Sequence, residues 1–288
     1  MQYKLTYYFK CLIAGDGPIE PRAFPFYNQF YLSFNNGLFV RNKVVDTTLM
    51  WDMENDKFVM PIIADGQPLL NRTVPFSMPR DKHWSPYTWQ GEVYMLYSYD
   101  PLRIIKCDPS FHCKFTQNMA PKDYQFDEVF NSIRGGTPTL TYRDNFYITI
   151  AHSTLFRQLQ PRRKRYYTMN LVVMRLEGES NHQVIYMSEP IELNAELMNS
   201  VHIVRDMFIS HPFLFPVSLL MEDEDSIVIG GHISDQSSYL FRLTGIRKLM
   251  DRVISRSRYL DKQGPPRDFM HNMSRTLAHQ QTGFNFMS

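Results

Sequence analysis

The sequence contains few of the residues that crosslink a small domain or bind a metal. Cysteine occurs three times, as Cys11, Cys107 and Cys113, without the C-x-x-C spacing of many zinc sites. A chain of 288 residues that is 43% hydrophobic can bury a core without such crosslinks. We therefore expect buried, reduced thiols and no metal or other cofactor, with a Cys107–Cys113 bridge or a metal site as the alternatives.

Long apolar runs and an excess of one charge are also absent. The densest apolar run, residues 213–221, is far shorter than the roughly 20 residues of a membrane span. Lys and Arg number 31 against 29 Asp and Glu, so the net charge of +2 gives no basic surface typical of nucleic-acid binding. No clear signal-peptide cleavage site follows the apolar start of the chain. We expect a soluble, cytoplasmic protein without a nucleic-acid partner.

Helical periodicity is scarce before residue 244, and short alternating segments separated by turn residues predict an all-β fold. No glycine-rich loop follows a strand and opens a helix, which excludes Rossmann and P-loop nucleotide sites. One pattern recurs: a proline, a short strand, a polar turn, and a stronger aromatic or β-branched strand. The four copies cover residues 20–35, 85–99, 137–153 and 215–233, with prolines at Pro21, Pro86, Pro138 and Pro216.

Repeats of this size favour a β-propeller, in which antiparallel blades surround an axis. The four copies and the N-terminal strand allow four or five blades within residues 1–245. We predict five, with the N-terminal strand at residues 2–13 closing a blade against the segment near residues 180–210. A sandwich of two packed sheets is the alternative. Residues 246–260 carry an amphipathic helical pattern, and residues 261–288 form a polar tail for which we expect partial disorder. We expect the helix to pack outside the propeller, with a membrane or partner contact through its basic side as the alternative.

In a propeller the innermost strand of each blade starts near the axis, and a proline is tolerated at the first residue of a strand. Polar residues beside the four prolines therefore converge on one axial pocket, the concave kind of site that binds ligands. Those residues are Glu20, Arg22, Asp81, Lys82, His83, Trp84, Arg134, Gly135, Gly136, Thr137, Ser210 and His211.

At these residues the chain resembles a known family. "GPIEPRAFPFYNQFYLSFN" is similar to the Gly-x-Glu-Asp-Pro-Arg blade start of five-bladed propellers related to glycoside hydrolase family 130, whose relatives include glycosyltransferase family 108. "DKHWSPYTWQ" resembles the Glu-Lys-Asn-Trp-x-Pro-Phe segment of one branch of these propellers. "RGGTPTLTYRDNFYITIAHS" resembles the Arg-Gly-Gly-[Ser/Thr]-Pro blade start of that branch, which ends in a histidine, here His152. The resemblance covers residues 15–245 and implies a carbohydrate-active enzyme.

The chain departs from the family pattern at four of these positions. The usual Glu-Asp pair reads Ile19-Glu20, which lengthens the acid by one methylene, and Asp81 and His83 replace the usual Glu and Asn. The basic cluster that binds phosphate in the family's phosphorylases has no clear counterpart. The resemblance implies that Glu20 is the catalytic acid or base.

The residue types favour one reaction over its relatives. An inverting hydrolase needs two carboxyl groups about 6.5–9.5 Å apart, whereas a transferase needs one base and cations that stabilise a departing phosphate. The candidate residues include one well-placed carboxyl group, that of Glu20, and five basic side chains: Arg22, Lys82, Arg134, His152 and His211. We therefore predict an inverting glycosyltransferase that uses an activated, phosphate-bearing sugar donor and a glycan acceptor. An inverting phosphorylase or hydrolase, or a non-catalytic glycan-binding propeller, is the alternative.

Three further segments carry functional candidates. The basic stretch at residues 155–167 reads either as a solvated hairpin loop or as a lid whose arginines bind a diphosphate, and its Tyr167 is a candidate to stack on a sugar. "EDEDS" at residues 222–226 predicts a solvated turn rather than a metal–nucleotide motif. Asp235 follows a strand of the fourth repeat and is a further candidate for substrate binding.

Overall fold

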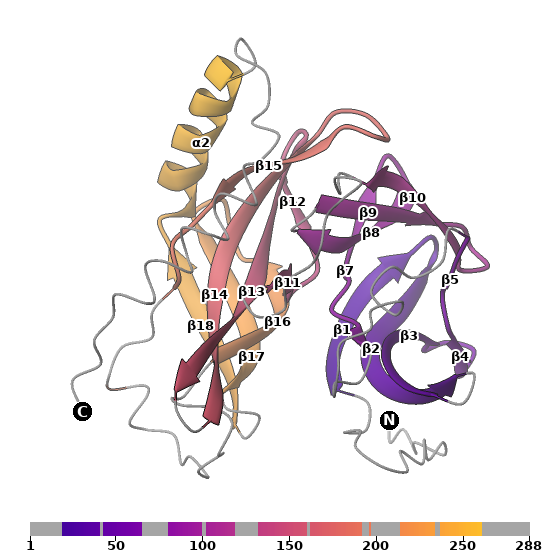
Figure 1. Ribbon diagram of the computed structural model, residues 1–288. Helices are drawn as coiled ribbons and strands as arrows, with labels where there is room; N and C mark the ends of the chain where they lie inside the picture. Colours follow the sequence, from indigo (N-terminus) through magenta and orange to yellow (C-terminus); the bar gives the residue numbers. More distant parts are fainter. Residues whose placement is uncertain are drawn as a thin grey trace. The chain divides into compact units, whose positions relative to one another are not determined.

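The computed structural model describes residues 19–40, 43–64, 80–99, 102–118, 132–159, 162–191, 196, 214–233 and 237–260. The described strands form four sheets, and a helix follows the last of them (Figure 1). The chain divides into two compact units, which are described separately below. Unit 1 comprises residues 1–83 and 107–114, and unit 2 comprises residues 84–106 and 115–288.

Unit 1 contains the first sheet, whose antiparallel strands follow the chain order. These strands are β1 (Ile19–Phe26), β2 (Gln29–Val40), β3 (Lys43–Asp52) and β4 (Lys57–Val59), and β6 (Arg80–Asp81) pairs with β3 in parallel. The short β5 (Ile62–Ile63) pairs in parallel with the first residues of β10 (His112–Asn118). The register of β1 against β2 shifts between Ile19 and Arg22, so Pro21 lies where the ladder is interrupted and its missing N–H costs no bond.

Unit 2 holds three runs of strands. β7 (Ser85–Trp89), β8 (Glu92–Tyr99) and β9 (Leu102–Cys107) are neighbours in one sheet. The next sheet has the order β11-β13-β14-β15, with β12 paired to β13; its strands are β11 (Ser132–Gly135), β12 (Leu140–Arg143), β13 (Phe146–Leu159), β14 (Arg162–Leu176) and β15 (His182–Met187). The last sheet consists of β16 (Leu214–Met221), β17 (Ser226–Ile233) and β18 (Ser237–Thr244).

Each sequence repeat forms one antiparallel hairpin of a separate sheet. The four hairpins are β1–β2, β7–β8, β12–β13 and β16–β17. This confirms the all-β propeller class and the reading of each proline-led pattern as the start of a blade-like sheet. The sequence predicted five blades, whereas the described residues form four sheets.

The expected fifth blade accounts for this difference. Its N-terminal strand, residues 2–13, lies outside the described residues. Its other component included the region of β15, which pairs instead with β14, from Val172 opposite Met187 to Leu176 opposite His182. The physical reason is the short turn after β14, which returns the chain directly alongside that strand.

The core of unit 2 lies on both faces of the β13–β14 hairpin. Side chains alternate between the two faces of a strand, and here both faces are apolar. Ile148 and Leu171 belong to one buried cluster, whereas Tyr147 and Val172, each one residue away, belong to the other. This two-sided burial explains why these strands read as nearly continuous apolar runs.

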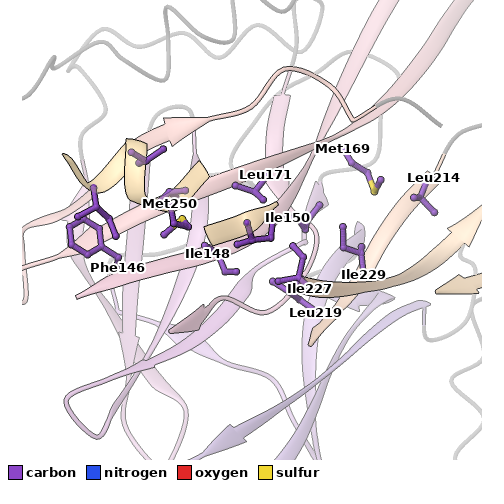
Figure 2. Packing of buried hydrophobic residues seen from close by; sticks show 14 of the residues in the cluster. Phe146, Ile148, Ile150, Met169, Leu171, Leu214, Leu219, Ile227, Ile229 and Met250 are labelled. Carbon is purple, nitrogen blue, oxygen red and sulfur yellow. The ribbon is translucent and has the colours of Figure 1, made fainter. Parts of the chain in front are cut away.

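The helix α2 (Ile246–Leu260) confirms the C-terminal helical pattern. Its apolar stripe, including Met250 and Ile254, is buried in the first of these clusters, and Figure 2 shows Met250 close to Phe146 and Ile148 of β13. Asp225 caps the N-terminus of the helix, since its carboxylate accepts a hydrogen bond from the backbone N–H of Arg247 at 3.1 Å. Among the described helical residues, no segment is long and apolar enough to cross a membrane. The tail at residues 261–288 lies outside the described part of the chain.

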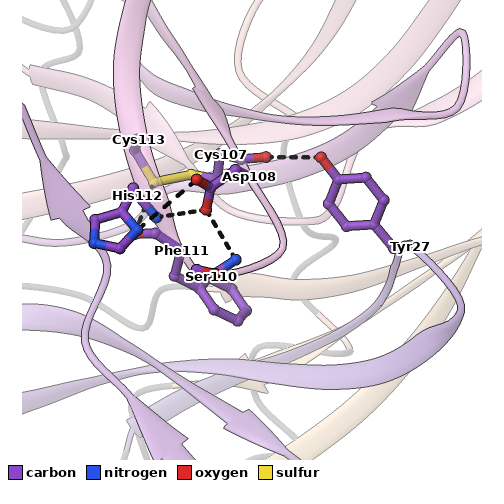
Figure 3. The surroundings of a disulfide bond; sticks show 7 residues. All are labelled: Tyr27, Cys107, Asp108, Ser110, Phe111, His112 and Cys113. Atoms are coloured by element: carbon purple, nitrogen blue, oxygen red, sulfur yellow. Dashed lines mark hydrogen bonds and ion pairs between the residues drawn. A yellow bond between two sulfur atoms is a disulfide. The ribbon is translucent and has the colours of Figure 1, made fainter.

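The expectation of three reduced thiols is wrong for two of them, because Cys107 and Cys113 form a disulfide (Figure 3). The chain turns back between them: the Asp108 N–H donates to the His112 carbonyl at 3.0 Å, and the Asp108 carboxylate accepts the N–H groups of Ser110 and His112. This turn brings the two cysteine Cα atoms to 4.1 Å. Disulfides are typical of oxidising compartments; the cytoplasmic location stays a prediction.

Two loop expectations have different outcomes. The described residues of the basic stretch at 155–167 do not form an irregular loop, since they continue β13 and β14 as paired strands from Leu155 opposite Tyr166 to Leu159 opposite Arg162. The role of this hairpin as a lid stays a prediction. Residues 222–225 do form the predicted turn between β16 and β17. There the Glu222 N–H donates to the Ser226 carbonyl at 3.1 Å.

Candidate functional site

The carboxylate of Glu20 is the centre of a buried polar cluster in unit 1. Its Oε2 accepts a hydrogen bond from Asn35 Nδ2 at 2.5 Å and lies 2.6 Å from His83 Nδ1. Arg22 Nη2 is 3.8 Å from the same oxygen. Only 10% of the Glu20 side chain is exposed, so this carboxyl group is held by neighbours rather than by bulk solvent.

Three strands bring these partners together. Asn35 lies on β2 opposite Ile19, the residue before Glu20, and Thr48 of β3 lies opposite Asn35. Parallel pairing of β6 with β3 then carries the chain past β3 to His83. The Asn35 Oδ1 atom accepts the His83 backbone N–H and the Thr48 hydroxyl, each at 3.3 Å. Its amide is thereby oriented with Nδ2 toward Glu20.

Arg22 fixes the backbone beside the acid. It is buried, and its Nη1 donates to the Glu20 carbonyl oxygen at 2.9 Å. A buried guanidinium is costly unless carboxylates or carbonyls satisfy it. Arg22 therefore makes two interactions with Glu20: a hydrogen bond to its carbonyl oxygen and a longer ion pair with its carboxylate.

Both members of the Glu20–His83 contact have left-handed backbones. Their φ angles are 55° and 69°, which is uncommon for residues other than glycine. Such a conformation costs about 1–2 kcal/mol per residue. Strained residues persist where surrounding contacts hold them, and they concentrate at functional sites. The coincidence of two such residues in one 2.6 Å contact marks this cluster as the candidate site.

The two oxygens of Glu20 are in different situations. The contacts with Asn35, His83 and Arg22 all converge on Oε2. Among the described residues of unit 1, the hydrogen bond to the carboxylate is to Oε2, and none is made to Oε1. A proton on this carboxyl therefore belongs on Oε1, because Oε2 already faces donors.

Two other predicted residues of unit 1 lie beside this cluster. The backbone of Asp81 pairs with Thr47 of β3, next to Thr48. Lys82 is buried between Asp81 and His83 in sequence. The structure thus brings Glu20, Arg22, Lys82 and the backbone of Asp81 into one region of unit 1, and a role for these residues toward substrate stays a prediction.

A second group of predicted residues meets in unit 2. Arg134 of β11 lies opposite His152 of β13, and the His152 Nδ1–H donates to the Gly135 carbonyl at 3.1 Å. The His152 ring centroid is 4.4 Å from that of Phe215 and 6.4 Å from that of Tyr167. Phe215 also stacks on His232 at 5.2 Å.

Three predicted residues of unit 2 occupy packing positions. The Thr137 hydroxyl accepts the Ile150 N–H at 3.0 Å and lies 3.2 Å from the Thr149 hydroxyl. A side chain on Gly136 would meet the Ile150 carbonyl oxygen at 2.5 Å. Trp84 is 1% exposed and its ring lies 5.4 Å from that of Tyr97. Their contacts stabilise the starts of two sheets, and a role toward substrate stays a prediction.

His211 and Asp235 lie outside the described residues. Sequence analysis missed Asn35 and Thr48, and it placed His83 among the converging residues without giving it a role. The available signal was the pair Asn35-Asn36, two consecutive amides in a strand of mainly apolar and aromatic residues. Within the described ranges, no group of three His, Cys, Asp or Glu side chains is arranged to hold a metal ion.

Comparison with known proteins gives matches only among solved structures. No family profile and no curated protein matches the chain. The β-1,2-mannobiose phosphorylase of Listeria innocua, solved with β-1,2-mannobiose, has a TM-score of 0.47 and 13% identity over 82% of this chain. This chain spans 60% of the length of that enzyme.

Two more structural matches have lower scores. A mannose phosphorylase from Leishmania mexicana, solved with phosphate, has a TM-score of 0.37 and 8% identity over 81% of this chain and 87% of its own. The α-L-arabinanase of Cellvibrio cellulosa has a TM-score of 0.33 and 13% identity over 78% of this chain and 72% of its own.

Proposed function

We propose that the protein is a carbohydrate-active enzyme, an inverting glycosyltransferase that moves a sugar from a phosphate-bearing donor to a glycan hydroxyl. The observation that carries this proposal is the asymmetric environment of Glu20, whose Oε2 is held by donors while Oε1 has none among the described side chains. Such a carboxylate is oriented to exchange a proton at one defined atom. The sequence resemblance to carbohydrate-active propellers supports the same assignment.

In the proposed reaction Glu20 is the general base. The acceptor hydroxyl gives its proton to Oε1, and its oxygen forms a bond to the anomeric carbon of the donor. The bond between that carbon and the phosphate oxygen breaks, and the phosphate-bearing group leaves with the electron pair. Attack from the face opposite the leaving group inverts the anomeric configuration.

Two features favour transfer over hydrolysis. The Glu20 cluster contains one carboxylate among its described side chains, whereas an inverting hydrolase requires a second carboxylate about 6.5–9.5 Å away. The same cluster contains the buried cation Arg22, and the neighbouring Lys82 is buried as well. Cations that are held in place stabilise the negative charge of a departing phosphate.

Ligand-dependent thermal stability tests the proposal. The purified protein is heated with nucleotides, nucleotide sugars, sugar 1-phosphates, inorganic phosphate or simple glycosides. A ligand that binds only the native state adds about 2.7 kcal/mol at 100 times its dissociation constant, so stabilisation by an activated donor, followed by transfer to a glycan, is the expected result. Stabilisation by phosphate and a sugar without any nucleotide or donor effect would point to a phosphorylase instead. Glycan binding without turnover would point to a binding module.

A further inference from the structure

Asn35 donates a hydrogen bond to the Glu20 carboxylate from the interior of a sheet. Its Nδ2 lies 2.5 Å from Glu20 Oε2, and its own side chain is fully buried. Asn35 stands on β2 with Ile19 of β1 opposite it on one side and Thr48 of β3 on the other. The donor is therefore carried by the central one of three paired strands.

Two further hydrogen bonds determine which end of the Asn35 amide faces Glu20. The Asn35 Oδ1 atom accepts the His83 backbone N–H and the Thr48 hydroxyl, each at 3.3 Å. A half-turn of the amide would place Oδ1 against the carboxylate and the NH₂ group against the His83 N–H, so acceptors would face acceptors and donors would face donors. Asn35 is thus fixed as a donor toward Glu20.

The Glu20 carboxylate depends on such a contact for its orientation. Three rotatable bonds separate the carboxyl group from the backbone, so the position of the backbone does not by itself place the two oxygens. A turn about the last of these bonds exchanges Oε1 and Oε2, and it would break the hydrogen bond from Asn35. Arg22 is a weaker restraint, because its Nη2 is 3.8 Å from Oε2 while its Nη1 donates to the Glu20 carbonyl oxygen.

We propose that Asn35 is the positioning residue of Glu20: it holds Oε2 through Nδ2, so that Oε1 is the oxygen that exchanges a proton with substrate. This inference rests on the proposed function, because it takes Glu20 as the base. During the reaction the proton passes from the acceptor hydroxyl to Oε1, while both hydrogens of Asn35 Nδ2 stay in place. Asn35 acts through Glu20 and does not touch the reacting atoms.

Unit 1 contains a second asparagine that makes the same kind of contact elsewhere. Asn55 Nδ2 donates to Asp52 Oδ2 at 2.7 Å, and Asn55 is exposed. Asn35→Asp and Asn55→Asp therefore make the same chemical change, since each replaces an amide donor with a carboxylate that faces another carboxylate. Each also keeps the size of the side chain and one acceptor oxygen.

A stability measurement tests the contact without any substrate. In the full-length protein Asn35→Asp should lower the melting temperature by on the order of 5 °C, because two carboxylates then share a buried site. Adding Glu20→Gln should restore most of this loss, since the glutamine amide can donate to the new carboxylate. Glu20→Gln should not restore any loss caused by Asn55→Asp. A double variant Asn35→Asp/Glu20→Gln that is no more stable than Asn35→Asp would overturn the inference, whatever the protein catalyses.

Kinetics with the donor identified by thermal stabilisation test the positioning role. Misplacement of a reacting group by about 1 Å costs on the order of 10²-fold in rate. We expect kcat of Asn35→Ala to fall by about that factor with KM within a few-fold, and Asn55→Ala to keep the kcat of wild type. The rescued double variant should stay inactive, because the acid is then on the wrong residue.

The outcomes separate this inference from the proposed function. A folded Asn35→Ala protein with wild-type kcat would overturn the inference, and if this variant does not fold, recovery of stability in the double variant decides. Failure of the proposed function is visible by itself, as a wild-type protein that shows no turnover with any activated donor.

Discussion

The Tyr87 hydroxyl lies 2.7 Å from His182 Nδ1 inside the aromatic core of unit 2. Burial raises the pKa of Tyr87 well above its usual value, so the phenol keeps its proton and donates it to Nδ1. Burial also lowers the pKa of His182 from 6.5 to about 4, against the opposing effect of the Glu179 carboxylate. The imidazole is therefore neutral at physiological pH, and its protonation is linked to folding.

This linkage predicts loss of stability in mild acid. The unfolded chain protonates His182 below about pH 6.5, whereas the native protein does so only near pH 4, so the unfolded state binds more protons between these values. For each unit by which the pH falls within this window, His182 lowers the free energy of unfolding by about 1.4 kcal/mol. Urea unfolding at pH 7.5 and pH 5 measures the effect. His182→Gln should show a smaller difference than wild type, while His112→Asn should not.

Gly136 is required by close packing rather than by its backbone flexibility. A Cβ at this position would lie 2.5 Å from the Ile150 carbonyl oxygen and 2.6 Å from Pro216 Cγ. Gly136→Ala should therefore lower the free energy of unfolding by about 1–3 kcal/mol, the usual cost of overpacking. Gly178→Ala is the matched control, since the added Cβ would meet Asn181 Cβ at an ordinary 4.0 Å. Equal melting temperatures for the two variants would contradict the proposed clash.

The disulfide supports an aromatic contact at the hairpin tip. Phe111, between the bridged Cys107 and Cys113, stacks on Phe26 at 4.1 Å, and the Tyr27 hydroxyl donates to the Cys107 carbonyl at 3.1 Å. A disulfide that closes so short a loop raises the free energy of the unfolded chain by about 2 kcal/mol. We expect the double variant Cys107→Ser/Cys113→Ser to lose about that much stability.

A reducing agent provides the matching measurement. It should destabilise the wild-type protein and the Cys11→Ser variant but leave the double variant unchanged. If the melting temperature of the wild-type protein did not change with the reductant, the result would instead support the sequence-based expectation of free thiols.

The repeats predicted the hairpins well because proline, turn and alternating side chains are local signals. Pro21 and Pro216 lie where the register shifts, as a residue without an N–H requires. The helix could also be predicted from the sequence, because Met250 and Ile254 recur at helical spacing. Local signals could not reveal that residues 155–167 extend two strands, because charged and aromatic side chains at that density suit both a loop and a paired strand.

The site was only half predictable for a similar reason. Glu20 and Arg22 stand two residues apart and were recognised together. Asn35 and His83 are 15 and 63 positions from Glu20, and only the pairing of β1 with β2 and of β6 with β3 brings them to it. The Cys107–Cys113 bridge was underestimated because cysteine spacing does not show whether the intervening residues form a turn.

Substitutions at Glu20 separate catalysis from structural support. Glu20→Gln keeps the shape of the side chain but cannot accept the proton of an acceptor hydroxyl. General acid–base catalysis contributes roughly 10²–10⁴-fold, so kcat should fall by about that factor while the dissociation constant of the donor changes by no more than a few-fold. Glu20→Asp keeps the acid but shortens its reach, and it should retain part of the turnover. A Glu20→Gln protein with wild-type kcat would contradict the assignment of Glu20 as base.

Arg22→Ala should behave differently from either Glu20 variant. Removal of this guanidinium leaves the Glu20 carbonyl without its 2.9 Å donor and the carboxylate without a buried cation at 3.8 Å. Breaking a buried pair typically costs about 3–5 kcal/mol, so both the free energy of unfolding and donor affinity should fall. Thermal unfolding and donor titration, measured on all three variants, distinguish the two roles. If Glu20→Gln and Glu20→Asp lose as much stability as Arg22→Ala and no activity beyond it, Glu20 serves only to anchor the start of β1 through Arg22.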